Sequence, residues 1–160
     1  MSVNFRPIEK KDNAELAELI RKVFCEFKID RPGTVYTDPS TDSLFELFRA
    51  PGSHYRVVEE NGILLGGCGI YPTNGLPEGC AELVKFYLSA TSRGKGIGKE
   101  LMQMCIQLAK ESGYRQLYLE SFPELETAVG MYENAGFKKI TAPMGNSGHH
   151  ACTLWMIKEL

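Results

Sequence analysis

The chain has 160 residues, the size of one domain, and we expect a single domain over residues 1–160. Its 18 Lys and Arg residues against 20 Asp and Glu residues give a net charge of −2, which excludes an overall basic field for nucleic acid or an anionic membrane surface. The N-terminus has no apolar signal core, and no run approaches the ~20 apolar residues of a membrane helix. We therefore expect a soluble, cytoplasmic protein without a nucleic-acid or membrane partner.

The first half of the chain begins with alternating apolar and polar residues, which predict a strand. Asp12 followed by Glu15 has the spacing of a capping box at the start of a helix. Asn61-Gly62 favours a hairpin between two strands. In chain order we predict a strand, a long helix, a short helix and three strands, over residues 3–8, 13–28, 43–50, 54–60, 63–71 and 81–88.

The second half contains two more helices. One apolar stripe at helical spacing predicts the buried face of the first of them: Ile97, Leu101, Met104, Cys105 and Leu108. Ser121 and Glu124 look like a second capping box. The first helix should end near residue 112. After it we expect a strand over 115–121, a helix over 124–134 and two strands over 137–142 and 151–159. Successive strands followed by strand-helix-strand predict an α/β (α+β) fold with a mixed sheet and helices on both faces.

The five cysteines are an odd number and form no CxxC pair, so buried free thiols in a reducing compartment are the expected state. Neither they nor the three histidines have the spacing of metal ligands, and we expect no metal. Cys80 and Cys152 could be acyl-accepting nucleophiles, but the sequence places no base or positive charge beside either of them. Direct transfer without a covalent enzyme intermediate is therefore favoured.

The stretch "SRGKGIGKEL" at residues 92–101 combines three glycines with the start of a helix. It lacks the spacing of the P-loop and that of the dinucleotide fingerprint G-x-G-x-x-G. The remaining pattern, Arg93-x-x-Gly96-x-Gly98, still has the properties of an anion site. Free amides and the positive end of the helix dipole lie at a helix N-terminus, and glycines let a phosphate come close. Arg93 and Lys95 add charged donors.

Two motifs resemble the GNAT superfamily of acyl-CoA N-acyltransferases. "LVKFYLSATSRGKGIGKELMQMCIQLAKESG" is similar to that family's central strand, its R/Q-x-x-G-x-G/A loop and its helix. "AVGMYENAGFKKI" is similar to the second motif, which carries a tyrosine and a Gly-Phe pair. The resemblance covers nearly the whole chain in element order. It implies a mostly antiparallel central sheet of about 6–7 strands with helices on both faces.

The resemblance also implies how acetyl-CoA, the expected cosubstrate, is held. The pantetheine arm would follow the strand before the loop, along Phe86, Tyr87 and Leu88. Arg93 would help to frame the loop. The pyrophosphate would be bound by the backbone amides of Gly94, Lys95, Gly96, Ile97, Gly98 and Lys99.

The second motif places Tyr132 near the sulfur of CoA. A phenol with pKa ~10 can donate a hydrogen bond or proton to the departing thiolate. The alternative is a packed helix aromatic with a structural role. Many family members carry Asn seven residues before this Tyr, whereas this chain has Leu125, so we do not transfer the role of that Asn.

A general base is expected because a protonated amine cannot attack a thioester. Glu82 is the first candidate, alone or through a water, because counting by two along the strand puts it on one face with Val84, Phe86 and Leu88. An apolar face would raise its pKa toward the range of a useful base. A bulge would break that count. Glu120 and Glu60, at the ends of two other strands, are weaker candidates.

Residues of two loops are candidates for the acceptor site. His149 and His150 lie in a loop that either lines the acceptor pocket or is plain surface. Asp38 and Asp42 would suit a cationic acceptor, but acidic loop residues are commonly only solvated.

The expected function is transfer of an acetyl group from acetyl-CoA to a primary amine on a small molecule or a peptide, in a ternary complex. The alternative is a non-catalytic acyl-CoA-binding sensor on the same fold. We expect a monomer or a homodimer, since the last strand can pair within the chain or with a second copy.

Overall fold

The protein, described here by a computed structural model over residues 3–160, combines seven strands with four α-helices. The strands are β1 (Val3–Pro7), β2 (His54–Glu60), β3 (Ile63–Tyr71), β4 (Cys80–Leu88), β5 (Gln116–Ser121), β6 (Lys138–Ile140) and β7 (Leu154–Glu159). The α-helices are α1 (Asn13–Glu26), α2 (Leu44–Leu47), α3 (Ile97–Glu111) and α4 (Glu126–Asn134). Three short 3-10 helices cover Lys10–Asp12, Pro39–Asp42 and Ala90–Ser92.

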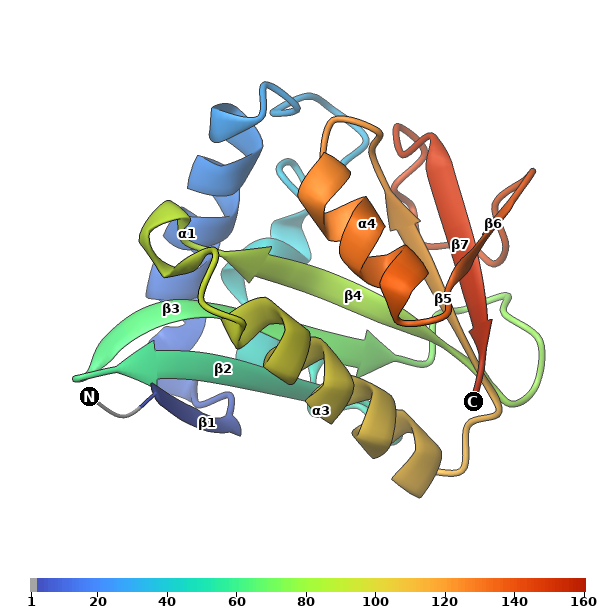
Figure 1. Ribbon diagram of the computed structural model, residues 1–160, viewed down its shortest axis with the longest axis horizontal. Helices are drawn as coiled ribbons and strands as arrows, with labels where there is room; N and C mark the ends of the chain where they lie inside the picture. The colour runs from blue at the N-terminus through green and yellow to red at the C-terminus, as the bar shows by residue number, and fades with distance from the viewer. Residues whose placement is uncertain (1–2) are drawn as a thin grey trace.

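The strands form one 7-stranded sheet in the order β1-β2-β3-β4-β5-β7-β6. Every neighbouring pair is antiparallel except β4 and β5, which run parallel. Figure 1 shows the helices distributed over the two faces of this sheet. The predicted mixed, mostly antiparallel fold with helices on both faces is confirmed.

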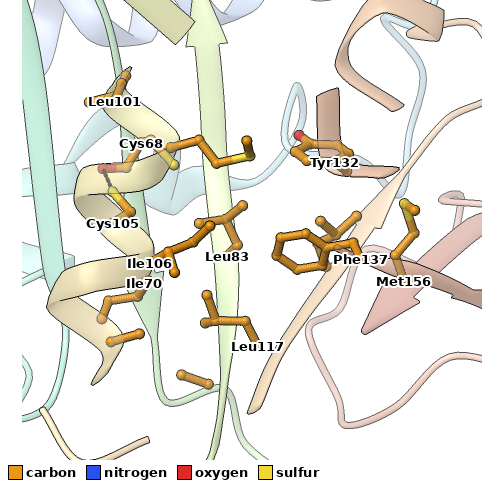
Figure 2. Packing of buried hydrophobic residues seen from close by; sticks show 14 of the residues in the cluster. Cys68, Ile70, Leu83, Leu101, Cys105, Ile106, Leu117, Tyr132, Phe137 and Met156 are labelled. Atoms are coloured by element: carbon orange, nitrogen blue, oxygen red, sulfur yellow. Dashed lines mark hydrogen bonds between the residues drawn. The ribbon is translucent and has the colours of Figure 1, made fainter. Parts of the chain in front are cut away.

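The two faces carry separate hydrophobic cores. On one face, α3 and α4 pack over the sheet, and Figure 2 shows Leu101, Cys105 and Ile106 of α3 facing Leu83, with Tyr132 and Phe137 beyond. On the other face, α1 and α2 pack over the sheet, together with apolar residues from the segments that follow each helix. The sheet thus lies between two apolar layers, and its strand ends and loops are left to form sites.

The buried face of α3 is wider than the predicted stripe. Met102, Ile106 and Ala109 are buried beside the predicted Ile97, Leu101 and Cys105, whereas Met104 and Leu108 of the predicted stripe are only partly buried. The helix contacts β2, β3 and β4 together, and a helix lying across three strands buries more than a single row of side chains.

Strand β4 contains a bulge that changes which side chains share a face. Gly69 pairs with Val84 but Gly67 pairs with Tyr87, so β4 has one extra residue, and Lys85 there has a positive φ of 52°. The extra residue reverses the alternation. Phe86 and Leu88 pack in the core under α3, while Val84 and Tyr87 pack in the core under α1. The expectation that Glu82 shares a face with Phe86 and Leu88 is therefore wrong; it shares one with Val84.

Strands β4 and β5 are paired over only three residues each, from Cys80 to Glu82 and from Gln116 to Tyr118. Beyond these residues the strands diverge, as Figure 1 shows. On its other side, β4 stays paired with β3 as far as Leu88. The backbone groups of Phe86 to Leu88 that point toward β5 are therefore left without a strand partner.

Both predicted capping boxes are wrong. Asp12 precedes α1, but its carboxylate binds Arg6 at 2.8 Å and accepts from the Glu9 amide at 2.7 Å, so it is not available to the helix. Ser121 belongs to β5, and α4 begins only at Glu126. Asp12 is taken by neighbouring residues of the chain, whereas Ser121 is taken by the pairing of β5 with β7. No helix within residues 3–160 is long and apolar enough to cross a membrane.

Candidate active site

A groove of about 700 Å³ runs between the C-terminal end of α1, the end of β4, the glycine-rich loop and the N-terminal half of α4. Its walls combine apolar side chains with the backbone of the loop. They include Val23, Phe27, Phe86, Tyr87, Leu88, Arg93, Gly94, Gly96, Gly98, Lys99, Leu125 and Met131. The groove follows the unpaired side of β4 and then reaches the start of α3.

The loop before α3 has the geometry of an anion site. Gly94 and Gly96 have φ values of 78° and 79°, a left-handed conformation that L-residues with a side chain rarely adopt. A Cβ atom at either position would meet nothing within 4 Å, so the loop backbone borders open space. Within the described chain, no backbone amide of residues 94–99 donates to another backbone group outside the regular helix, and the first α3 bond runs from Glu100 to Gly96. These free amides suit a phosphate.

The side chain of Arg93 makes its polar contacts with other residues of the protein. Its guanidinium donates to the carbonyl of Leu88 at 2.9 and 3.2 Å and pairs with Glu26. It also lies 5.1 Å from the ring centre of Phe27. Arg93 thus ties the end of β4 to α1, which is consistent with a residue that frames the loop.

A second, small cavity of about 40 Å³ lies where β4 and β5 diverge. Side chains distant in sequence meet here from β4, β5, α4 and the loop before β7. They include Glu82, Lys85, Phe86, Glu120, Leu125, Tyr132, His149 and Cys152. Phe86, Tyr87 and Leu125 line the groove as well, so the two spaces adjoin. The structure brings together both predicted catalytic residues, Glu82 and Tyr132.

Glu82 is 3% exposed, and its carboxylate accepts a 2.6 Å hydrogen bond from the Thr73 hydroxyl. Burial raises the pKa of this carboxyl group to about 7, and the nearby Glu120 adds to the rise, while Thr73 and Lys85 act against it. A carboxyl group that titrates near neutral pH is suited to accept a proton from an amine.

Tyr132 is 7% exposed and packs between Phe86 and Phe137, with ring centres 6.1 and 5.9 Å away. Burial raises the pKa of its phenol above the ordinary value, so the hydroxyl keeps its proton at neutral pH. No residue of the described chain hydrogen-bonds this hydroxyl, and it remains available as a donor. Leu125 caps α4 with backbone only and lines both spaces as an apolar side chain.

The loop before β7 is fixed over the cavity by polar contacts. Glu120 accepts hydrogen bonds from the hydroxyls of Tyr118, at 2.7 Å, and Ser147. His149 lies 2.7 Å from Asp38, which also accepts from the Ser40 amide. Burial alone would raise the pKa of Asp38, but the bonds from His149 and Ser40 lower it to about 2. This loop and the loop of Asp38 therefore close the cavity together.

The other candidates lie elsewhere. Glu60 ends β2, where it pairs with Val3 and Ile63 in the sheet. Asp42 forms an ion pair with Arg21. The ring of His150 lies against Gly33, at an exposed position. None of these three lines the cavity.

The two cysteines considered as nucleophiles have raised pKa values. Burial raises that of Cys80 to about 11 and that of Cys152 to about 12, in each case with a contribution from Glu82. Both therefore remain thiols at neutral pH, and a thiol is a poor nucleophile. Within residues 3–160, no group of three or more His, Cys, Asp or Glu side chains could hold a metal ion.

Several polar residues of this region escaped the sequence interpretation. Thr73, Ser147 and Tyr118 reach the cavity residues through contacts that no local pattern signals. Lys85 did carry a signal, since a lysine in the middle of the apolar run "AELVKFYL" requires an explanation.

Comparison with known proteins identifies what this arrangement is similar to. A sequence profile described as "Acetyltransferase (GNAT) family" matches residues 17–137. A protein of Escherichia coli strain K12, described as "Uncharacterized N-acetyltransferase YjgM", is 36% identical over 156 residues, which covers 97% of this chain and 93% of that protein.

Solved structures share the fold at lower identity. A GNAT-family acetyltransferase from Staphylococcus aureus Mu50 superposes with a TM-score of 0.86 at 22% identity, covering 99% of each chain. The PaiA N-acetyltransferase of Thermoplasma acidophilum, solved in complex with coenzyme A, has a TM-score of 0.74 at 19% identity and covers 100% of each chain.

Proposed function

The chain belongs to the GNAT family of acetyltransferases, and from that premise we propose that it transfers the acetyl group of acetyl-CoA directly to a primary amine. The observation that carries the proposal is the meeting of Glu82 and Tyr132 in one cavity beside the groove. One group can accept a proton from the amine, and the other can donate a proton to the departing sulfur.

The lining of the groove has the chemistry that binding of coenzyme A would require. The open amides of the loop and the N-terminus of α3 would hold the pyrophosphate, with Lys95 and Lys99 adding positive charge. The unpaired backbone of Phe86 to Leu88 would bind the pantetheine arm as a neighbouring strand binds. This path leads the thioester to the adjoining cavity.

The two residues then act on opposite sides of the transfer. Glu82, in its ionised form, accepts a proton from the acceptor ammonium, directly or through a water, and the neutral amine attacks the thioester carbonyl. The new C–N bond forms, the C–S bond breaks, and the nitrogen passes its second proton to the thiolate by way of the Tyr132 hydroxyl. The Tyr132 hydroxyl donates to the leaving thiolate, and an amide of the β4 segment stabilises the charge on the carbonyl oxygen. Neither step needs a covalent enzyme intermediate.

Release of free thiol from acetyl-CoA tests the proposal. The protein is incubated with acetyl-CoA and a panel of primary amines, and thiol is measured over a no-acceptor background. We expect turnover with at least one amine and N-acetylated product by mass spectrometry. Tight acetyl-CoA binding without turnover for the whole panel would favour a non-catalytic sensor, in which Leu125, where many relatives have Asn, would be part of the difference.

A further inference from the structure

Lys85 is a buried cation with no protein partner. It sits at the bulge of β4, is 7% exposed and lines the small cavity. Among residues 3–160, no carboxylate lies within ion-pair distance of its ammonium and no protein acceptor bonds it; since no fully buried polar side-chain atom of these residues lacks a partner, the ammonium must reach the open space of the cavity. Lysine is among the residues least often buried, and when buried it is normally paired.

The acidic groups around the same cavity each have a partner. Glu82 accepts from Thr73, and Glu120 accepts from Tyr118 and Ser147. Asp38 is bound by His149 and by the Ser40 amide. Lys85 is therefore the one charged side chain lining this cavity for which the described residues supply no hydrogen bond.

Burial without a partner is costly for the charged form of a lysine. It lowers the pKa of Lys85, although Asp38 and Glu82 lie near enough for their charges to act in the opposite direction. A ligand anion placed against the ammonium would stabilise the charged form and satisfy the group. A ligand anion could therefore act as the counter-ion of Lys85.

The three carboxylates decide what kind of ligand can supply that anion. A simple anion would be repelled by Glu82, Glu120 and Asp38. A simple amine would be attracted by them but would leave Lys85 unpaired. A molecule that carries both an ammonium and a carboxylate meets both requirements. Its ammonium would lie toward Glu82 and Glu120, and its carboxylate would pair with Lys85.

On this basis, and resting on the acetyl transfer proposed above, we propose that the acceptor is a free amino acid, whose carboxylate is bound by Lys85 while its amine is acetylated. Lys85 thus determines specificity, and Glu82 and Tyr132 perform the chemistry.

A matched acceptor series tests this assignment. L-phenylalanine, L-phenylalaninamide and phenethylamine share a side chain, but only the first has a carboxylate, and the same triplets are made from L-leucine and L-methionine. For at least one triplet we expect kcat/KM to be about 100-fold higher for the amino acid than for its amide. Lys85→Met should abolish this preference, so that kcat/KM for the amino acid falls to about the value for its amide in the same variant. Lys22→Met, at an exposed position of α1, should change neither.

A second readout separates this inference from the proposed function. Calorimetry measures binding of each amino acid and each amide to the protein saturated with CoA, and CoA binding itself reports whether Lys85→Met is folded. Binding that requires the carboxylate and is lost in Lys85→Met would support the anchor even without turnover. Equal kcat/KM for amino acids, amides and amines would overturn the assignment of Lys85. Equal binding of amino acids and amides, or no binding of either, would overturn it as well. Since the wild-type comparison uses no variant, it stands even if Lys85→Met does not fold.

Discussion

The hydroxyl of Tyr55 in β2 donates a 2.8 Å hydrogen bond to the backbone carbonyl of Lys85 in β4, across the intervening strand β3. The ring crosses β3 at Gly67 and Gly69, where a Cβ atom would lie 2.4 and 2.6 Å from the ring. The bulge frees this carbonyl from the regular ladder, and Tyr55 satisfies it. A tyrosine two strands away thus holds the segment from which Lys85 and the unpaired backbone of β4 extend.

Tyr55→Phe should destabilise the protein by about 1–3 kcal/mol, because the Lys85 carbonyl would stay buried without a donor. Denaturant unfolding measures the loss. Tyr114→Phe is the matched control, since its hydroxyl also donates to a backbone carbonyl, that of Gly52, but at an exposed position where water can replace it. Equal destabilisation of the two variants would mean that Tyr55 does not support the bulge.

Tyr132→Phe should lower kcat about 100-fold while leaving the Kd for CoA unchanged. The phenylalanine ring keeps the contacts with Phe86 and Phe137, so only the donor to the thiolate is removed. Steady-state kinetics and calorimetry on the same preparation separate the two effects. An unchanged kcat, or a loss confined to CoA binding, would assign Tyr132 a packing role.

The pKa of Glu82 predicts a pH dependence of stability. Its folded value of about 7 lies above the ordinary 4.5, so the folded state binds the proton more tightly than the unfolded state does. The contribution of Glu82 to stability is then greatest below pH 4.5 and is lost as the pH rises to about 7, by up to about 3 kcal/mol. Glu82→Gln should lack this part of the pH dependence and should lose most of the acetyl-transfer rate. The comparison is made by chemical unfolding at pH 5 and pH 8, and parallel behaviour of the two proteins would refute the raised pKa.

Gly96→Val should weaken CoA binding at least about tenfold, because its φ of 79° is unsuited to a β-branched residue and the side chain would project where the phosphates are expected. Gly113→Val provides the control. Gly113 has a comparable φ of 91° and open space around it, but lies beyond the far end of α3. Both variants should lose similar stability, and only the first should lose affinity in calorimetry. A loss of affinity in both would point to general strain.

The fold and the glycine-rich loop beside the groove could be predicted from local patterns. The turn at Asn61-Gly62, the apolar segments of the strands and the loop before Ile97 are each determined by residues close in sequence, and all are present in the structure. The end of α3 at Glu111 is likewise signalled by the Ser112-Gly113 pair that follows it. Such features depend on dihedral preferences and spacing, which a single sequence contains.

The cavity was only half readable, because its remaining features depend on distant partners. Glu82 was assigned to its place in the strand, but the face that it shares changed because of the bulge at Lys85. That bulge is supported by a hydroxyl on β2 and by two glycines on β3, and no count along β4 alone could have located it.

The divergence of β4 and β5 has a consequence for association as well as for ligand binding. A sheet normally confines its unpaired strand edges to its two margins, where charge, brevity or a bulge discourages a foreign strand from adding on. This protein has a further edge in the interior of its sheet, and the exposed stretch of β4 is short and bent by the bulge. Aromatic and apolar side chains of α4 stand beside it. A short, bent edge of this kind suits one thin, extended chain better than the broad ribbon of another protein's sheet, which lowers the risk of aggregation at an unpaired strand.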